Sequence, residues 1–304
     1  MQRLSVNRDD PLYTYAISFM ERAWKVKGFF PGAQPVSIEY RHFDILSSNE
    51  YLVCEKTDGL RFMLLAFMYN NKKTCVLINR ALDVYTCPLN FRKPIYDGTI
   101  IEGELYKDTF MAYDCMMVRG SKIGESDMID RLKHMEDLQK MLTVLKYDPI
   151  KFKIKTFHVM AEFEKFMNEY LPTVEQEIDG LIFTPVKDPV QKGTHETMFK
   201  WKPKDKNTID FQFKRKGDLW KLYVQKRGKL MFESEIHTYQ VPEHIDVQED
   251  SIIECQYMLD DSPMWWKPIM RRYDKTFPNS RRTFYRTLVN IKEGIIMADF
   301  LKCT

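Results

Sequence analysis

Short strand-like runs separated by tight turns constrain the fold of this chain more than any other feature. Between residues 51 and 118, apolar, aromatic and β-branched residues gather in runs, and Asp-Gly or Asn-Asn pairs punctuate them. The spacing is too short for crossover helices, so neighbouring strands should pair antiparallel. The predicted strands cover residues 51–55, 62–69, 74–78, 99–105 and 110–118.

Helical periodicity flanks and follows these strands. Asp10-Pro11 is a plausible start for the first helix, and Ser126 is a candidate cap for the second, methionine-rich one. Both stripes of apolar residues are typical of core packing. The predicted helices cover residues 12–26, 128–145, 161–170 and 282–301.

The pattern changes near residue 210, where short strands at residues 219–225, 230–237 and 251–258 suggest a small β-barrel. The expected fold class is therefore α+β. We expect a mixed, mainly antiparallel domain over residues 1–209 and the barrel over residues 210–283. A helix over residues 284–304 should pack back on the first domain.

Charge is balanced overall but unevenly distributed. The 304 residues hold 46 Lys and Arg against 43 Asp and Glu, a net charge of +3. Residues 200–229 carry a local charge of +8, residues 233–261 hold nine acids and no Lys or Arg, and residues 266–286 carry +6. Such blocks could bind a polyanion such as a nucleotide or RNA, or could form only a solvated surface.

Composition also excludes several classes of protein. The six cysteines and six histidines are dispersed, with no spacing typical of a zinc site, so buried free thiols in a reducing compartment are expected. No apolar run approaches the ~20 residues of a transmembrane helix, and the N-terminus is polar. We therefore expect an intracellular protein without a membrane partner.

The sharpest chemical motif covers Glu55–Arg61, in which Asp58-Gly59 predicts a tight turn between two strands. A lysine can serve as a covalent nucleophile once it is deprotonated, and Lys56 beside this turn is the candidate. Arg61 could hold phosphate or ribose oxygens. By itself, the motif fits an ordinary hairpin with a surface lysine about equally well.

The order of several motifs resembles the covalent nucleotidyltransferases, which include DNA ligases, RNA ligases and mRNA capping guanylyltransferases. Lys-x-Asp-Gly-x-Arg is their signature. Glu102-Gly103-Glu104, Tyr113-Asp114 and Asp179-Gly180-Leu181-Ile182 resemble the motifs that follow it. The resemblance implies a nucleotidyltransferase domain in which Lys56 is catalytic. The nucleotide would contact Arg61, Arg80, Glu104, Tyr113, Lys200 and Lys202.

Two further sequence motifs indicate the capping subclass of this superfamily. Phe199–Pro203 followed by Asn207–Phe211 resembles the capping guanylyltransferase form, and so does Trp266–Lys275 followed by Pro278-Asn279. In that family the last string lies on an OB-fold lid, which here would present Arg272, Asp274 and Lys275. The resemblance covers about residues 36–296, and its layout looks most like the compact capping enzymes of large DNA viruses.

This resemblance implies a two-step reaction. Lys56 would attack GTP to form a Lys–GMP phosphoramidate, and a 5′-diphosphate RNA would then accept GMP to give a 5′–5′ triphosphate cap. Mg²⁺ or Mn²⁺ would bind Glu104, Asp179 and Asp210. The lid residues would act on the departing pyrophosphate.

The implied partners are GTP and 5′-diphosphate RNA, together with a separate RNA triphosphatase and cap methyltransferase. The compartment would be the host cytoplasm if the protein is viral, with the nucleus also possible. Two alternatives stay open at this point. One is an ATP-dependent polynucleotide ligase, and the other is an inactive module that binds RNA 5′ ends.

Overall fold

The computed structural model describes residues 5–143, 150–259, 261–273 and 275–304. The chain forms two compact units. The first unit comprises residues 1–36, 44–200 and 301–304, and the second comprises residues 37–43 and 201–300. Each unit has its own sheets and its own core.

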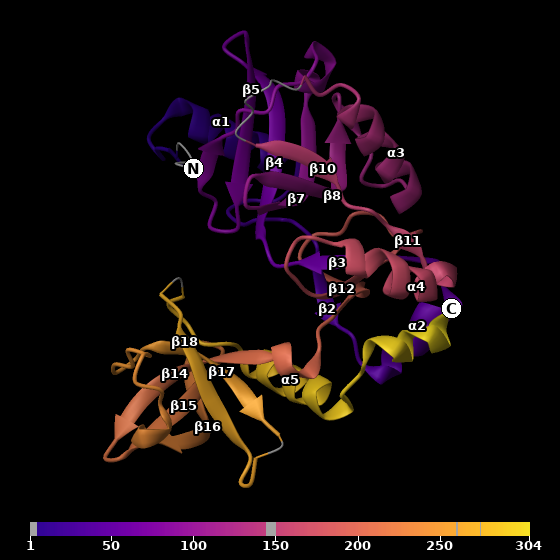
Figure 1. The fold of residues 1–304 in the computed structure, drawn as a ribbon. Coiled ribbons are helices and arrows are strands. Elements are labelled where there is room, and N and C mark those ends of the chain that lie inside the picture. The colour runs from indigo at the N-terminus through magenta and orange to yellow at the C-terminus, as the bar shows by residue number, and fades with distance from the viewer. Residues whose placement is uncertain (1–4, 144–149, 260, 274) are drawn as a thin grey trace. The chain divides into compact units, whose positions relative to one another are not determined.

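The larger sheet of the first unit has the strand order β1-β6-β5-β4-β7-β8-β10, with β9 beside β8 (Figure 1). Its pairs are antiparallel except for β10, which runs parallel to β8. The predicted antiparallel pairing is thus confirmed for most of the sheet. The strands are β1 (Ser5–Val6), β4 (Leu60–Tyr69), β5 (Lys72–Asn79), β6 (Val84–Thr86), β7 (Thr99–Tyr106), β8 (Thr109–Val118), β9 (Ser121–Lys122) and β10 (Lys151–Ile154).

Helices cover both faces of this sheet, which explains the unbroken apolar run in β4. Met63, Leu65 and Phe67 pack in the same core as α1 (Pro11–Trp24). Their neighbours in the strand face the core of α3 (Met128–Gln139) on the other side. Because successive side chains of a strand point to opposite faces, a strand buried on both faces is apolar throughout.

The smaller sheet of the first unit has the order β11-β3-β12-β13-β2. Its β3 is followed at once in the chain by β4, yet the two strands belong to different sheets. Asp58-Gly59 is therefore a crossing between sheets, which corrects the expectation of a hairpin at this turn. The strands are β2 (Gln34–Ser37), β3 (Tyr51–Thr57), β11 (His158–Val159), β12 (Ile178–Pro185) and β13 (Thr194–Trp201).

The helices lie where the sequence predicts them, but some of them begin or end at other residues than predicted. Asp10 caps α1 as expected, since its side chain accepts a hydrogen bond from the amide of Leu12. Asp127, not Ser126, caps α3, because its carboxylate reaches the amide of Asp130 at 3.0 Å. The helix ends at Gln139, so its predicted extension is wrong over residues 140–143, and residues 144–145 lie outside the described residues. The remaining short α-helices of this region are α2 (Phe43–Ser48) and α4 (Phe163–Lys165).

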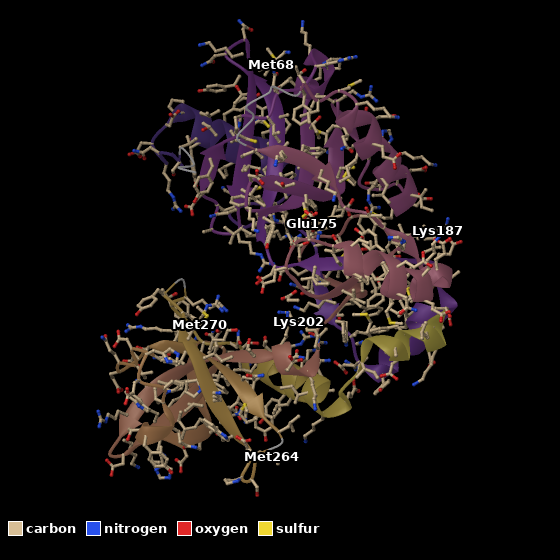
Figure 2. All side chains as sticks on the ribbon, in the orientation of Figure 1. Met68, Glu175, Lys187, Lys202, Met264 and Met270 are labelled. Carbon is tan, nitrogen blue, oxygen red and sulfur yellow. The ribbon has the colours of Figure 1, made fainter. Side chains whose placement is uncertain are left out.

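The second unit holds one five-stranded antiparallel sheet with the order β16-β15-β14-β17-β18. The predicted barrel is not closed, because no ladder joins the edge strands β16 and β18 in the described residues. Met270, on the edge strand β18, and Met264, just before this strand, are half exposed (Figure 2). The strands are β14 (Thr208–Lys216), β15 (Leu219–Lys226), β16 (Lys229–His237), β17 (Ile252–Met258) and β18 (Trp265–Arg271).

The C-terminal helix is shorter than predicted. Helix α5 (Arg281–Glu293) ends where Gly294 adopts a left-handed conformation, and a 3₁₀ segment follows over Met297–Cys303. Phe284 and Ile291 of α5 lie in the core of the second unit. Residues 301–304, at the end of the predicted helix, belong to the first unit, so the predicted packing of residues 284–304 on the first domain stays a prediction.

The cysteines behave as their dispersion predicts, since all six are buried and free. Among the described residues, no helix combines the length and apolarity that crossing a bilayer requires.

One buried ion pair fastens α3 to the larger sheet. Arg131 is 1% exposed, and its Nε and Nη2 donate to the two carboxylate oxygens of Asp114 at 2.7 and 3.2 Å. Its Nη1 donates to the carbonyl oxygens of Ser126 and Asp188. This bidentate geometry compensates the cost of burying the charges, and removal of one partner would leave the other uncompensated.

We expect Asp114→Asn to destabilise the protein by about 3–5 kcal/mol, because it leaves the Arg131 guanidinium buried without its counter-ion. Urea unfolding measures this loss. Asp137→Asn is the matched control, because its ion pair with Lys140 on the same helix is exposed and should leave the midpoint unchanged. Equal midpoints for both variants would contradict the structural role given to Asp114.

Candidate active site

Lys56 and Asp179 meet across the antiparallel pair β3–β12. The Nζ of Lys56 lies 2.7 Å from Oδ1 of Asp179, and both side chains are largely buried. The register shifts between Ile178 and Gly180, so Asp179 is the extra residue of a bulge. A β-bulge changes the direction in which side chains point, and this one directs the Asp179 carboxylate toward Lys56. The structure thus brings together two residues predicted to lie in one site.

Arg61 enters the same region from the other sheet. Its guanidinium pairs with the buried carboxylate of Glu102 on β7, directly beside its cross-strand partner Glu104. The Nε of Arg61 is buried without an acceptor among the described residues. Since unpaired buried donors are costly, this atom is well suited to receive an oxygen of a ligand.

Tyr113 completes this arrangement from β8. Its ring lies 5.9 Å from the Arg61 guanidinium, and its hydroxyl donates to Oε2 of Glu102 at 3.4 Å. Burial, opposed in part by Arg61, raises the pKa of Tyr113 well above its usual value, so the phenol keeps its proton. An aromatic ring at this place can also stack on a base.

The segment before β2, for which the sequence offers no motif, lies on Arg61. The Phe30 ring is 5.5 Å from the Arg61 guanidinium. A Cβ on Gly32 would lie 2.5 Å from Nη2 of Arg61 and 2.5 Å from Oε2 of Glu102, so only glycine fits. Backbone hydrogen bonds to Gly193 hold this segment in place. The Pro-Gly pair in this segment predicts a turn, but the local sequence does not indicate that the turn packs against Arg61.

A further buried ion pair lies beside the Arg61–Glu102 pair. Lys155, which follows β10, places Nζ 3.2 Å from Oε2 of Glu104 and 3.1 Å from the carbonyl oxygen of Glu55. The side chain of Lys155 is 3% exposed. The sequence analysis missed this residue, because nothing adjacent to Lys155 identifies its partners.

Arg80 follows β5 and belongs to the same electrostatic neighbourhood. Burial and, after it, the nearby charge of Arg61 lower the pKa of Arg80. Two guanidinium groups that repel one another would both gain from an anion, which favours a phosphate-bearing ligand here.

The two lysines predicted near residue 200 fall on either side of the boundary between the units. Lys200 lies on β13, the neighbour of β12, and belongs to the first unit. Lys202 (Figure 2) follows β13 and belongs to the second unit.

The predicted lid residues gather around Asp210 in the second unit. Nη1 of Arg272 lies 3.2 Å from Oδ1 of Asp210 and 3.1 Å from Oε2 of Glu254, and Lys275 pairs with the other oxygen of Asp210. Asp274 lies outside the described residues. Asp210, predicted as a metal ligand, is therefore a counter-ion to two cations in this arrangement.

The acidic side chains predicted to bind a metal ion do not form a complete metal-binding site. Within the described parts of the chain, no three His, Cys, Asp or Glu side chains gather in a way that could hold a metal ion. Asp179 and Glu104 instead each contact a lysine. Mg²⁺ is commonly held by one or two carboxylates plus substrate phosphates, so this donor set fits an ion that arrives with a nucleotide.

Comparison with known proteins now identifies the family. The family model for the mRNA capping enzyme catalytic domain matches residues 6–204, and the model for the mRNA capping enzyme C-terminal domain matches residues 181–301. The chain belongs to the mRNA capping enzyme family. The family predicted from the motifs is thereby confirmed.

Individual relatives agree with this membership. The mRNA-capping enzyme subunit alpha of Schizosaccharomyces pombe is 28% identical, over 90% of this chain and 79% of the relative. The corresponding subunit of Eremothecium gossypii is 33% identical over 60% of this chain, and the mRNA-capping enzyme of Mus musculus is 28% identical over 86%. The chain spans about half the length of these last two relatives.

A mycobacterial DNA ligase D complexed with ATP and MES is a more distant structural match. It has a TM-score of 0.46 and 13% identity, over 81% of this chain and 96% of the ligase chain. The resemblance to viral capping enzymes stays a prediction, since the relatives described above are eukaryotic.

We expect Gly32→Ala in this capping-family chain to weaken GTP binding by about 10- to 100-fold. The added methyl group would displace the Arg61–Glu102 pair, and a charged hydrogen bond contributes about 1.5–3 kcal/mol. Calorimetric titration with GTP measures the change. Gly28→Ala is the control, because a Cβ there strains the same loop but meets nothing within 4 Å. Similar affinities for both variants would contradict the close fit at Gly32.

Proposed function

We propose that this chain is an mRNA guanylyltransferase that transfers GMP from GTP, through a covalent adduct on Lys56, to the 5′-diphosphate end of RNA. The observation that carries the proposal is the Lys56–Asp179 contact at the bulge of β12, inside the region that matches the capping catalytic family. The surrounding Arg61, Arg80 and Lys200 supply the positive charge that a triphosphate requires.

In the first step, the Nζ of Lys56 attacks the α-phosphorus of GTP. A P–N bond forms, the bond from the α-phosphorus to the bridging oxygen breaks, and pyrophosphate leaves. Asp179 is the carboxylate in hydrogen-bond reach of Nζ, so it is suited to orient the amine and to accept its proton. Arg61, through its buried Nε, would hold a ribose or phosphate oxygen, and Tyr113 would stack on the base.

In the second step, a terminal phosphate oxygen of the RNA diphosphate attacks the same phosphorus. The P–N bond breaks, the electron pair returns to Nζ of Lys56, and the 5′–5′ triphosphate bridge forms. Such transfers depend mainly on positioning and on neutralisation of phosphate charge. The diphosphate end has to come from an RNA triphosphatase, which we propose is a separate protein, as is the cap methyltransferase.

We propose that Mg²⁺ or Mn²⁺ is held by Asp179 and Glu104 together with phosphate oxygens. When bound, the ion would supply further neutralisation of the phosphate charge. Because Glu104 contacts Lys155, nucleotide binding would exchange that lysine contact for a metal contact at Glu104, whereas Asp179 would keep its contact with Lys56 while it contributes to the metal site. Asp210, whose two oxygens pair with lid cations, would act there as a counter-ion.

We expect Lys56→Arg to abolish covalent labelling of the protein by α-phosphate-labelled GTP, because a guanidinium stays protonated and cannot attack phosphorus. Labelling followed by denaturing electrophoresis measures this. Lys187→Arg is the control: Lys187 (Figure 2) is exposed and its ion pairs are on the surface, so the label should persist. Label that survives Lys56→Arg would refute the nucleophile, and label from ATP in place of GTP would indicate a ligase.

We expect Arg272→Ala to slow the first half-reaction far more than the second. The lid cation is proposed to act on the leaving pyrophosphate, which is absent once GMP is attached to Lys56. The measurement compares label uptake from GTP with the chase of preformed Lys56–GMP onto 5′-diphosphate RNA. Arg271→Ala is the control, since this neighbouring arginine pairs with Asp246 instead. Equal slowing of both half-reactions would contradict this division.

A further inference from the structure

Two cysteines, Cys75 and Cys87, lie directly opposite one another on neighbouring strands of the larger sheet. The register of β5 and β6 pairs Val76 with Thr86, and the pairing continues by one step, because the amide of Cys87 donates to the carbonyl oxygen of Cys75 at 2.9 Å. Directly opposite residues of an antiparallel pair share one face of the sheet. Both thiols accordingly lie in the core on the side of α3.

The two side chains are in direct contact. They form a hydrogen bond in which the Cys75 thiol is the donor and the Cys87 sulfur is the acceptor. A cross-strand pair that is joined by backbone hydrogen bonds has Cα atoms about 5.5 Å apart, which is a usual separation for a disulfide. A bond between the two sulfur atoms therefore requires no change in strand pairing.

The surroundings favour Cys87 as the reactive thiol of the pair. The hydrogen bond from the Cys75 thiol lowers the pKa of Cys87; burial opposes this effect, and a hydrogen bond from the Leu89 amide adds to it. At the other four cysteines, burial raises the pKa of the thiol. These four are Cys54, Cys115, Cys255 and Cys303.

Cys87 is close to solvent although it is buried. It is 8% exposed and lies between Thr86 and Pro88, both of which are exposed. It follows β6, a strand of three residues whose outer neighbour β1 has only two. Short strands at the edge of a sheet open locally at a lower free-energy cost than central strands. A small oxidant can therefore reach the Cys87 thiol without unfolding of the whole unit.

We propose that Cys75 and Cys87 form a dithiol site at which a peroxide produces an intramolecular disulfide. Such a site is independent of the proposed guanylyltransferase activity. With hydrogen peroxide, the Cys87 thiolate attacks one oxygen and the O–O bond breaks. Hydroxide leaves, takes up the proton that Cys87 had released, and becomes water, while Cys87 becomes a sulfenic acid.

The Cys75 sulfur completes the reaction from across the ladder. It attacks the Cys87 sulfur, the S–O bond breaks, and the hydroxyl group leaves as water with the Cys75 proton. Two thiols and one peroxide molecule thus give one disulfide and two water molecules. The bond would close the hairpin that carries Arg80 in its turn, at the end opposite this turn.

Peptide mapping tests the site directly. The native full chain is treated with hydrogen peroxide, its remaining thiols are alkylated in denaturant, and it is digested with trypsin without reduction. Because trypsin cleaves after Lys73, Arg80 and Arg92, the disulfide would join the peptides of residues 74–80 and 81–92. The thiol count should fall from six to four. Absence of the linked peptide, or equal oxidation of the other cysteines, would overturn the proposal, and so would a link that forms only in urea.

Cys75→Ser and Cys303→Ser are matched variants, because Cys75 and Cys303 are both 6% exposed. Cys303→Ser should form the linked peptide as the wild type does. Cys75→Ser keeps a hydroxyl donor toward Cys87, so peroxide should leave Cys87 as a sulfenic acid that dimedone labels. In Cys87→Ser, dimedone should not label Cys75. Loss of the link in Cys303→Ser would overturn the assigned pair, and stronger dimedone labelling of Cys75 than of Cys87 would overturn the assigned roles.

Hydrogen exchange measures the effect of the bond on the hairpin. Amides of residues 84–87 should exchange at least about tenfold more slowly in the oxidised protein, because the bond prevents β6 from separating from β5. Exchange of residues 219–226 in the second unit is the internal control and should not change. Unchanged or faster exchange of residues 84–87 in a protein that carries the linked peptide would overturn a bond that the native pairing accommodates.

Discussion

The site depends on one constraint, the passage of the chain from the smaller sheet to the larger one at Asp58-Gly59. Lys56 is fixed by the pairing of β3 with β12, whereas Arg61 is fixed by the pairing of β4 with β7. A Cβ on Gly59 would lie 3.2 Å from the carbonyl oxygen of Leu105, so the crossing runs close against β7. Strand pairing in two sheets therefore sets the separation of Lys56, the proposed nucleophile, and Arg61. Such support suits a reaction that depends on positioning.

Charge compensation is the second organising feature of the first unit. Lys56–Asp179, Arg61–Glu102 and Lys155–Glu104 are three largely buried ion pairs in one region. Burying charges is costly unless they are paired, so the pairs keep the site folded before a nucleotide arrives. Under the proposed function, a triphosphate with its metal ion would then exchange partners with these groups. The exchange is less costly than the creation of new buried charges, since the cations and carboxylates are already desolvated.

Sequence analysis found the site residues that lie within contiguous motifs and missed those that depend on distant pairing. Lys56 and Asp179 were predicted because turns and motif order identify them. Gly32 was missed, since its role arises only where the chain folds onto the Arg61–Glu102 pair. Lys155 was missed because alternation in the strand before it is typical of an exposed face, yet the side chain turns inward after β10 ends at Ile154. The crossing at Asp58-Gly59 could not be distinguished from a hairpin, because a local turn signal does not specify which strands pair. The strands themselves were predictable, since β4 is apolar on both faces.

The charge blocks of the second unit show why composition alone could not decide its partner. In sequence, basic residues 200–229 and 266–286 suggest two polyanion sites, but folding pairs several of their cations with the acidic block between them, among them Lys214, Arg271 and Arg272. The Asp210 carboxylate holds Arg272 and Lys275 together, which keeps two mutually repelling cations at one place in the absence of a phosphate. A polyanion with more than one charge would compete with Asp210 for both cations and with Glu254 for Arg272. Under the proposed function, Asp210 and Glu254 therefore take the place of the ligand at these cations, and a phosphate has to displace them before it can bind there.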